Sequence, residues 1–179
     1  MQQKYLISET IKISPKRIGN LIGKQGVFKK NLEEKLNAKL TINSKEGTIL
    51  CLLNDYDAYQ KLNNIIIAIS RGFSNKDVFL LLKPDFICSI IKLGNNKKTN
   101  IRQKSRIIGE KGKIKKSLER LCSVKISIYG KTICLIGKNK DMFLCQSAIN
   151  NLLKGVKHNI ALEILKKRKQ EEKHNQENQ

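Results

Sequence analysis

The stretch that decides the fold reads Leu-Ile-Gly-Lys-Gln-Gly at residues 21–26, and the chain repeats it as Ile-Ile-Gly-Glu-Lys-Gly at residues 107–112. In each copy two aliphatic residues precede a Gly-x-x-Gly tetrapeptide, a lysine-rich segment follows, and the likeness covers residues 21–42 and 107–128. A repeat of this length is too long for a solenoid unit and fits a small domain. Glycines at such a place let a nucleic-acid backbone come close to the chain. The sequence therefore predicts two similar domains, each with a phosphate-binding loop.

The composition favours a polyanionic partner. The chain has 179 residues, a formal net charge of +21 and 40% hydrophobic residues. A positive field of this size attracts nucleic acid most simply, although a bias towards lysine, asparagine and isoleucine accounts for part of it. An anionic membrane surface would attract it too, but no apolar run approaches the roughly 20 residues that span a bilayer. The N-terminus has no signal-peptide pattern. We expect a cytoplasmic protein with no membrane partner.

Metal, cofactor and catalytic chemistry are not expected. The five cysteines are odd in number and form no Cys-x-x-Cys pair, which favours buried thiols in a reducing cytoplasm. The two histidines, His158 and His174, both lie near the C-terminus, so a zinc site is not expected. Residues 109–117 lack the Walker A spacing, and no paired acidic cluster suggests a metal nuclease. The sequence predicts a protein without a cofactor that is not an enzyme.

Apolar periodicity predicts an α+β chain in which strand, helix, helix, strand, strand and helix occur twice. In the first half we expect these elements at 5–13, 16–22, 27–36, 39–42, 48–52 and from 55 onwards. In the second half we expect them at 86–93, 101–108, 113–122, 124–128, 132–136 and 141–154, with a polar loop at 94–99. A further helix is expected at 160–167, followed by a polar, frayed tail at 166–179.

Residues 71–75 punctuate the chain between the two halves. We therefore expect a first domain at 1–72, a linker or helical arm at 73–85, a second domain at 86–157, and a C-terminal helix with a polar tail at 158–179.

Residues 13–26 resemble the signature of the KH domain in its type I arrangement, and the second copy repeats it in register. The resemblance goes further in residues 106–112 and 124–132, in Arg-Gly-Phe-Ser at 71–74 and in Gly155-x-x-His158. These segments are similar to the archaeal two-KH family that corresponds to the "partner of the PIN endonuclease" small-subunit assembly factor, also called Dim-two. The resemblance covers roughly residues 5–168 and implies two tandem type I KH domains with a C-terminal helix.

The family resemblance implies a role and partners. The implied role is binding single-stranded RNA at the 3′ end region of small-subunit ribosomal RNA during ribosome maturation, without catalysis. The implied protein partners are a PIN-domain endonuclease and the alpha subunit of translation initiation factor 2. Two departures stand out. The eukaryotic relatives look degenerate in their first loop and carry an N-terminal extension, whereas here the first loop is intact. Glu110 occupies a loop position that many KH domains give to a basic or neutral residue.

The expected RNA site has three parts, because a KH loop clamps the backbone of about four nucleotides while their bases lie across an apolar groove. The loops are Gly23, Lys24, Gln25 and Gly26, and Gly109, Glu110, Lys111 and Gly112. The flanking basic residues are Lys29, Lys30, Arg106, Lys113, Lys115 and Lys116. The groove residues are Ile22, Ile42, Ile108, Ile126 and Ile128, with Ile18, Leu21, Leu40 and Ile107 as further candidates.

Two other functions compete with this one. A protein-interaction adaptor in ribosome assembly or translation initiation, with secondary RNA contact, would use the long helices and the helix at 160–167. A single-stranded DNA binder would use the same loops, since KH folds accept both sugars. We expect a monomer whose second domain dominates RNA affinity, because basic residues crowd its loop on both sides.

Overall fold

The chain folds into two compact units, Met1–Pro84 and Asp85–Gln179. The computed structural model describes the backbone of residues 5–177 and the side chains of residues 5–171. Residues 1–4, which belong to the N-terminus without a signal-peptide pattern, and the last two residues of the expected tail lie outside the described part.

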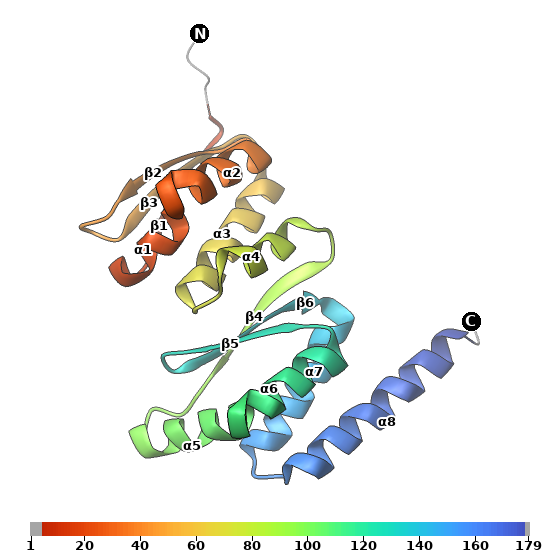
Figure 1. Ribbon diagram of the computed structural model, residues 1–179. Coiled ribbons are helices and arrows are strands. Elements are labelled where there is room, and N and C mark those ends of the chain that lie inside the picture. The colour runs from red at the N-terminus through yellow and green to blue at the C-terminus, as the bar shows by residue number, and fades with distance from the viewer. Residues whose placement is uncertain (1–4, 178–179) are drawn as a thin grey trace. The chain divides into compact units, whose positions relative to one another are not determined.

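The first unit has the expected order of elements (Figure 1). Its sheet has the order β1-β3-β2, with both pairings antiparallel, so β2 is an edge strand. The helices α1, α2 and α3 pack on the sheet face that carries Ile49, Cys51 and Leu53. The elements are β1 Ile7–Lys12, α1 Pro15–Ile22, the 3-10 turn η1 Lys24–Gly26, α2 Val27–Leu36, β2 Lys39–Asn43, β3 Thr48–Leu53, α3 Tyr56–Ser70, α4 Asn75–Val78 and the 3-10 turn η2 Phe79–Leu82.

Local chemistry fixes these boundaries. Pro15 opens α1, where its missing N–H costs nothing, and Gly23 ends that helix with a positive φ. The carboxylate of Asp55 accepts the N–H groups of Asp57 and Ala58, both at 3.1 Å, and so starts α3. The first strand is shorter at both ends than expected, which leaves Ile13 to pack in the core.

The second unit repeats this order and adds one helix. Its sheet has the order β4-β6-β5, again antiparallel, with β5 at an edge. The elements are β4 Phe86–Lys92, α5 Lys97–Ile108, the 3-10 turn η3 Glu110–Gly112, α6 Lys113–Cys122, β5 Lys125–Tyr129, β6 Thr132–Lys138, α7 Asn139–Leu153 and α8 His158–Glu177. The two β-α-α-β-β-α units and the C-terminal helix confirm the predicted fold class.

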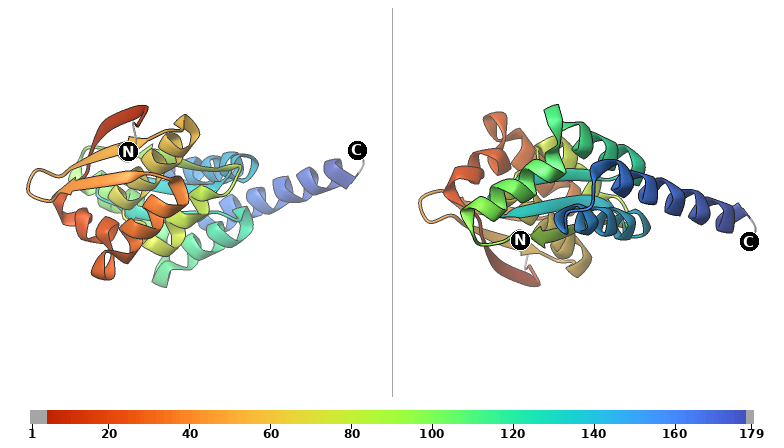
Figure 2. Two further views of the ribbon diagram at one scale, coloured as in Figure 1. Left: turned by 90° about the horizontal axis from the view of Figure 1, so that it is seen from above. Right: turned by 90° about the horizontal axis from the view of Figure 1, so that it is seen from below.

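Two expectations for the second unit were wrong. The polar loop at 94–99 ends early, because the side chain of Asn96 accepts the N–H of Lys98 at 2.9 Å and α5 begins at Lys97. The backbone also stays helical through most of the expected frayed tail, as far as Glu177 (Figure 2). Ala161 and Leu165 of α8 are buried against the unit, and the lysine, arginine, glutamate and glutamine that follow are good helix formers.

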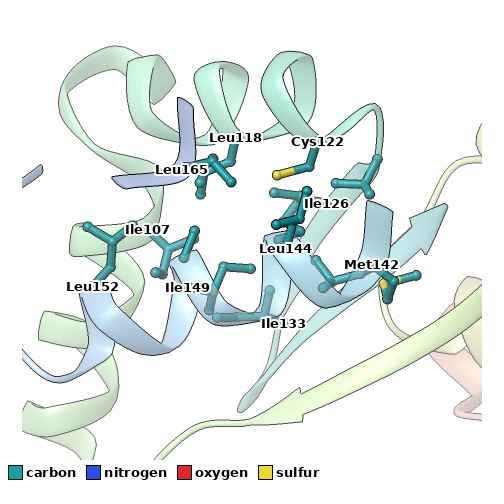
Figure 3. Close-up of a cluster of buried hydrophobic side chains, with 14 of the residues drawn as sticks. Ile107, Leu118, Cys122, Ile126, Ile133, Met142, Leu144, Ile149, Leu152 and Leu165 are labelled. Carbon is teal, nitrogen blue, oxygen red and sulfur yellow. The ribbon is translucent and has the colours of Figure 1, made fainter. Parts of the chain in front are cut away.

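The core of the second unit lies between the sheet and its helices. Figure 3 shows Ile107 of α5, Leu118 of α6, Ile133 of β6 and Ile149 of α7 in one cluster. All four of these side chains are fully buried. Leu165 of α8 joins the same cluster, so the C-terminal helix is part of this core.

No helix within residues 5–177 combines the length and the apolar character needed to cross a bilayer.

Candidate nucleic-acid interface

Both Gly-x-x-Gly loops adopt the same backbone shape between two helices. In the first loop φ is +73° at Gly23, +52° at Gln25 and +76° at Gly26. In the second the corresponding angles are +68° at Gly109, +48° at Lys111 and +76° at Gly112. Left-handed residues in such close succession make a tight turn that glycine adopts without strain. The sequence repeat is therefore also a repeat of geometry.

The first glycine of each loop is needed for packing. A Cβ on Gly23 would lie 2.6 Å from the Cβ of Phe28, and one on Gly109 would lie 2.8 Å from the Cβ of Ile114. Both distances are far inside van der Waals contact, and the two obstructing residues belong to the helix that follows. These glycines bring the helix start against the loop.

The second glycine of each loop faces open space. A Cβ on Gly26 or Gly112 would have no neighbour within 4 Å. Each of these glycines is also the N-cap of the next helix, α2 or α6. Because glycine has no side chain, the cap residue cannot accept the first N–H groups of the helix, and the positive end of the helix dipole faces the loop. This combination is suited to an approaching anion such as a phosphate.

Lysines surround both loops but differ in their exposure and in whether they pair with a glutamate. Most of the predicted polar contacts are exposed; these are Lys24, Gln25, Lys30, Glu110, Lys111, Lys113 and Lys116. Lys29 and Lys115 are half-buried, and each lies next to a glutamate one turn later, with Nζ–Oε1 distances of 3.4 Å to Glu33 and 3.6 Å to Glu119. Part of their charge is therefore balanced locally. Glu110 lies exposed in the loop, where it opposes an approaching phosphate.

The predicted apolar groove residues divide into surface and core. Ile22, Ile42 and Ile128 are half-buried, and Ile108 is 38% exposed, so these four have surface to offer a base. Ile126 is only 2% exposed and lies among the core side chains in Figure 3. The further candidates Ile18, Leu21, Leu40 and Ile107 are likewise buried. Their side chains pack in the core within each unit and leave little area for a base.

Arg106 has a local task that the sequence did not indicate. Its guanidinium donates hydrogen bonds to the carbonyl oxygens of Leu152 and Val156, both at 2.7 Å, at the end of α7. Arg17 of the first unit does the same at the end of α3, bonding Ile69 at 2.8 Å and Phe73 at 3.0 Å. Two of its five N–H donors serve these carbonyls, so Arg106 ties the end of α7 to the helix that leads into the loop.

Two glutamates were missed as site residues although they belong to the repeat. The Oε1 atom of Glu33 accepts the backbone N–H of Leu40 at 2.7 Å, and that of Glu119 accepts the N–H of Ile126 at 2.8 Å. Each bond ties the second helix of a unit to its edge strand. The signal that could have found them is the pair of Lys-x-x-x-Glu spacings at 29–33 and 115–119.

A hollow of about 430 Å³ opens beside the first loop, lined by Gly23, Lys24, Gln25, Val27, Phe28, Asn31 and Asn75. Lys24 and Gln25 at its rim are exposed, so the loop can be reached by a ligand from this side. Among the described residues no group of three His, Cys, Asp or Glu side chains is placed to hold a metal ion.

Two β-α-α-β-β-α units, each with a Gly-x-x-Gly loop between its first two helices, define a tandem KH protein of type I. The comparisons agree. Residues 86–170 match the family described as "Eukaryotic type KH-domain (KH-domain type I)", and residues 8–56 match the family described as "KH domain".

Known proteins that resemble the chain narrow the assignment. A KH domain-containing protein of Methanocaldococcus jannaschii is 31% identical, over 90% of this chain and 74% of that protein. A chain in the crystal structure of the a/eIF2alpha–aDim2p–rRNA complex from Pyrococcus horikoshii is 34% identical with a TM-score of 0.86, covering 92% of this chain and 95% of that one. The pre-rRNA-processing protein pno1 of Aspergillus fumigatus is 26% identical, over 69% of this chain and 53% of that protein. The chain belongs to the archaeal Dim2/PNO1 family of two-KH-domain RNA-binding proteins.

Proposed function

We propose that this protein binds single-stranded RNA near the 3′ end of small-subunit ribosomal RNA during ribosome maturation, as a monomer and without catalysing a reaction. The observation that carries the proposal is the open, left-handed second glycine at the start of α2 and of α6. The similarity to a chain from a complex that contains rRNA, and to a pre-rRNA-processing protein, supports the same function.

The geometry suggests how RNA is held. A phosphate lies against Gly112, where no side chain blocks it and the N–H groups at the start of α6 face it. Lys111 and Lys113, both exposed, add positive charge on either side. The bases that follow lie against the exposed part of Ile108 and Ile128. The first loop, with Lys24 and Gln25 before Gly26, holds a second stretch of backbone in the same way.

The second unit contributes most of the affinity. The exposed side chains around its loop include Arg102, Lys111, Lys113 and Lys116, and their charge outweighs that of Glu110. At the first loop the exposed basic residues are Lys16, Lys24 and Lys30, one fewer than at the second. Since each neutralised phosphate adds to the electrostatic part of binding, the loop with more free cations binds RNA more tightly.

Two protein partners complete the proposal. One is the alpha subunit of translation initiation factor 2, which is suggested by the name of the related complex. The other is a PIN-domain endonuclease, which the family resemblance suggests.

The test is a binding comparison by fluorescence anisotropy. We expect a labelled RNA with the 3′-end sequence of small-subunit ribosomal RNA to bind more tightly than a matched DNA or an unrelated RNA. Lys111→Asp with Lys113→Asp should abolish binding, whereas Lys140→Asp with Lys167→Asp, an equal change of charge on α7 and α8, should weaken it only slightly. Equal losses in the two double variants would show that net charge alone attracts RNA and would contradict the proposal.

A further inference from the structure

The glutamates Glu33 and Glu119 occupy equivalent places in the two units, and each holds an edge strand. Glu119 accepts the N–H of Ile126 at 2.8 Å, so this N–H points away from β6 and towards α6. The backbone groups of a strand point to alternate sides, so those of Ile128, two residues later, face the same free edge. The carboxylate of Glu119 therefore lies beside the free edge of β5, the strand that also carries the half-buried Ile128.

Each carboxylate has two neighbouring donors. The strand N–H and the lysine Nζ both lie next to Oε1, in Glu33 as in Glu119. An ionised carboxylate has about four lone-pair sites on its two oxygens, so these two donors do not exhaust it. Each glutamate side chain is 22% exposed, and the neighbouring lysine side chains are 31% and 35% exposed. Each carboxylate is thus held in place by its strand bond, partly exposed, and able to accept a further hydrogen bond.

The position along the helix matches the path of a bound strand. Lys115 and Glu119 lie one turn apart on the same face of α6, and the helix starts at the open Gly112. An RNA whose phosphate lies at Gly112 and whose base lies on Ile128 passes this face. The same relation holds for Gly26, Lys29, Glu33 and Ile42 in the first unit.

We propose that Glu119, and Glu33 in the first unit, determine base specificity by accepting a hydrogen bond from the exocyclic amino group of a bound base. An ionised carboxylate only accepts hydrogen bonds, and carboxylates pair with the N4 amino group of cytosine. Uracil is the RNA base without an exocyclic amino group, and its carbonyl oxygen O4 occupies the place of the cytosine N4. At the position next to Glu119 the protein therefore prefers cytosine to uracil. This inference rests on the proposed RNA binding and adds a rule for the base.

A purely structural role for these glutamates is separable by experiment, because Glu→Gln keeps the strand bond. The amide oxygen of glutamine accepts the same N–H, while the amide nitrogen becomes a donor that can reach the O4 of uracil. Glu119→Gln should therefore fold normally and change base preference. The matched controls are Glu34→Gln on α2 and Glu163→Gln on α8, which are exposed glutamates with the same change of charge.

The experiment measures anisotropy for single-stranded RNAs in which each position in turn is cytosine or uracil, with circular dichroism as a check of folding. The wild type should prefer cytosine about tenfold at one position of the RNA held by the second unit. Glu119→Gln should bring this ratio to one or reverse it, and both controls should keep it. Glu33→Gln provides an independent reading at the first unit.

A cytosine preference that survives Glu119→Gln unchanged at every position, with RNA still bound, would overturn this inference and leave the proposed function intact. Failure of the wild-type protein to bind any of the RNAs would overturn the proposed function, and this inference with it.

Discussion

At the scale of single residues, the two glycines of each loop have different tasks. Gly109 is crowded by Ile114, and Gly112 faces open space, yet both need a left-handed φ. The first is therefore a packing requirement, whereas no protein contact requires the second, which we propose is kept small for the RNA. The Gly-x-x-Gly motif does not distinguish the two glycines, and only the positions of neighbouring atoms show how they differ.

We predict that Gly112→Ala mainly weakens RNA binding and that Gly109→Ala mainly destabilises the fold. In Gly112→Ala the new methyl group meets no protein atom, and the strained backbone lowers stability by about 1–2 kcal/mol. Gly109→Ala carries the same strain and a collision with Ile114 as well. Thermal unfolding and RNA titration of both variants check this. If Gly112→Ala lost as much stability as Gly109→Ala, the open space at Gly112 would be in doubt.

Arg106 gives a second prediction at this scale. Arg106→Ala removes two charge-assisted hydrogen bonds, those to the carbonyls of Leu152 and Val156, although Leu152 still accepts the backbone N–H of Gly155. We expect a loss of about 2–4 kcal/mol in the free energy of unfolding, measured in urea. Arg102→Ala, which removes an exposed arginine on the same helix, should lose less than about 0.5 kcal/mol. Unchanged stability in Arg106→Ala would show that these two hydrogen bonds contribute little to the fold.

At the scale of elements, the sequence predicted what periodicity and punctuation encode. Alternation and glycine placement indicated the order of strands and helices in both units, because each element needs one apolar face. The end of α8 was missed because its final turns are polar all round and rest on helix propensity. We expected about half of the groove aliphatics to be core residues, but the sequence could not single out Ile126, because an aliphatic residue on an edge strand has the same pattern whether it packs inward or binds a base.

The remaining misses concern contacts across the chain. The bonds from Arg106 to α7 and from Glu119 to β5 join residues that no local pattern links. Charge near a loop predicted an RNA contact for Arg106, which stays a prediction, and it gave no sign of the bonds to the two carbonyls. The sequence therefore predicted where the two loops lie, but not the hydrogen bonds of Arg106 and Glu119 around the second loop.

Strand β3 carries a buried thiol that gives the stability a pH dependence. Burial, with a smaller contribution from Glu9, raises the pKa of Cys51 from its ordinary value of 9.0 to about 12. As pH rises, the thiol loses its proton at a lower pH in the unfolded chain than in the folded protein. The contribution of Cys51 to the free energy of unfolding is therefore full below about pH 9 and is lost progressively between about pH 9 and 12. We expect roughly 1.4 kcal/mol to be lost at pH 10 from this group.

Urea unfolding at pH 8 and pH 10 measures this effect. Cys51→Ala removes the thiol, and its free energy of unfolding should fall less between the two pH values than that of the wild type. The comparison separates Cys51 from the lysines and tyrosines that titrate in the same range. An equal fall in both proteins would show that the buried thiol has no part in the pH dependence.

At the scale of the whole molecule, charge and geometry make different contributions. The formal net charge of +21 attracts any polyanion, whereas in our proposal the two loops select a chain that can bring its backbone to a glycine. The first contribution is screened by salt, and the second persists. The balance between them decides how specific the protein is at physiological ionic strength.

We predict a steep salt dependence for RNA affinity. The logarithm of the association constant should fall with the logarithm of salt concentration, with a slope of about −0.7 for each phosphate neutralised on a single strand. If two loops each hold several phosphates, the slope is several times this value. Anisotropy titrations between 50 and 300 mM salt, about the range where screening changes most, measure it. A flat affinity would remove the electrostatic part of the account.

The central claim is that the glycine loops bind RNA and that the second loop dominates, and one comparison tests it most directly. Lys111→Asp with Lys113→Asp changes the second loop, and Lys24→Asp with Gln25→Asp changes the first; all four side chains are exposed, so neither change disturbs the core. We predict unchanged thermal stability in both variants, abolished RNA binding in the first and a smaller loss in the second. Unchanged stability with a greater loss from Lys24→Asp and Gln25→Asp would contradict the assignment of the dominant site, and unchanged affinity in both would contradict RNA binding at the loops.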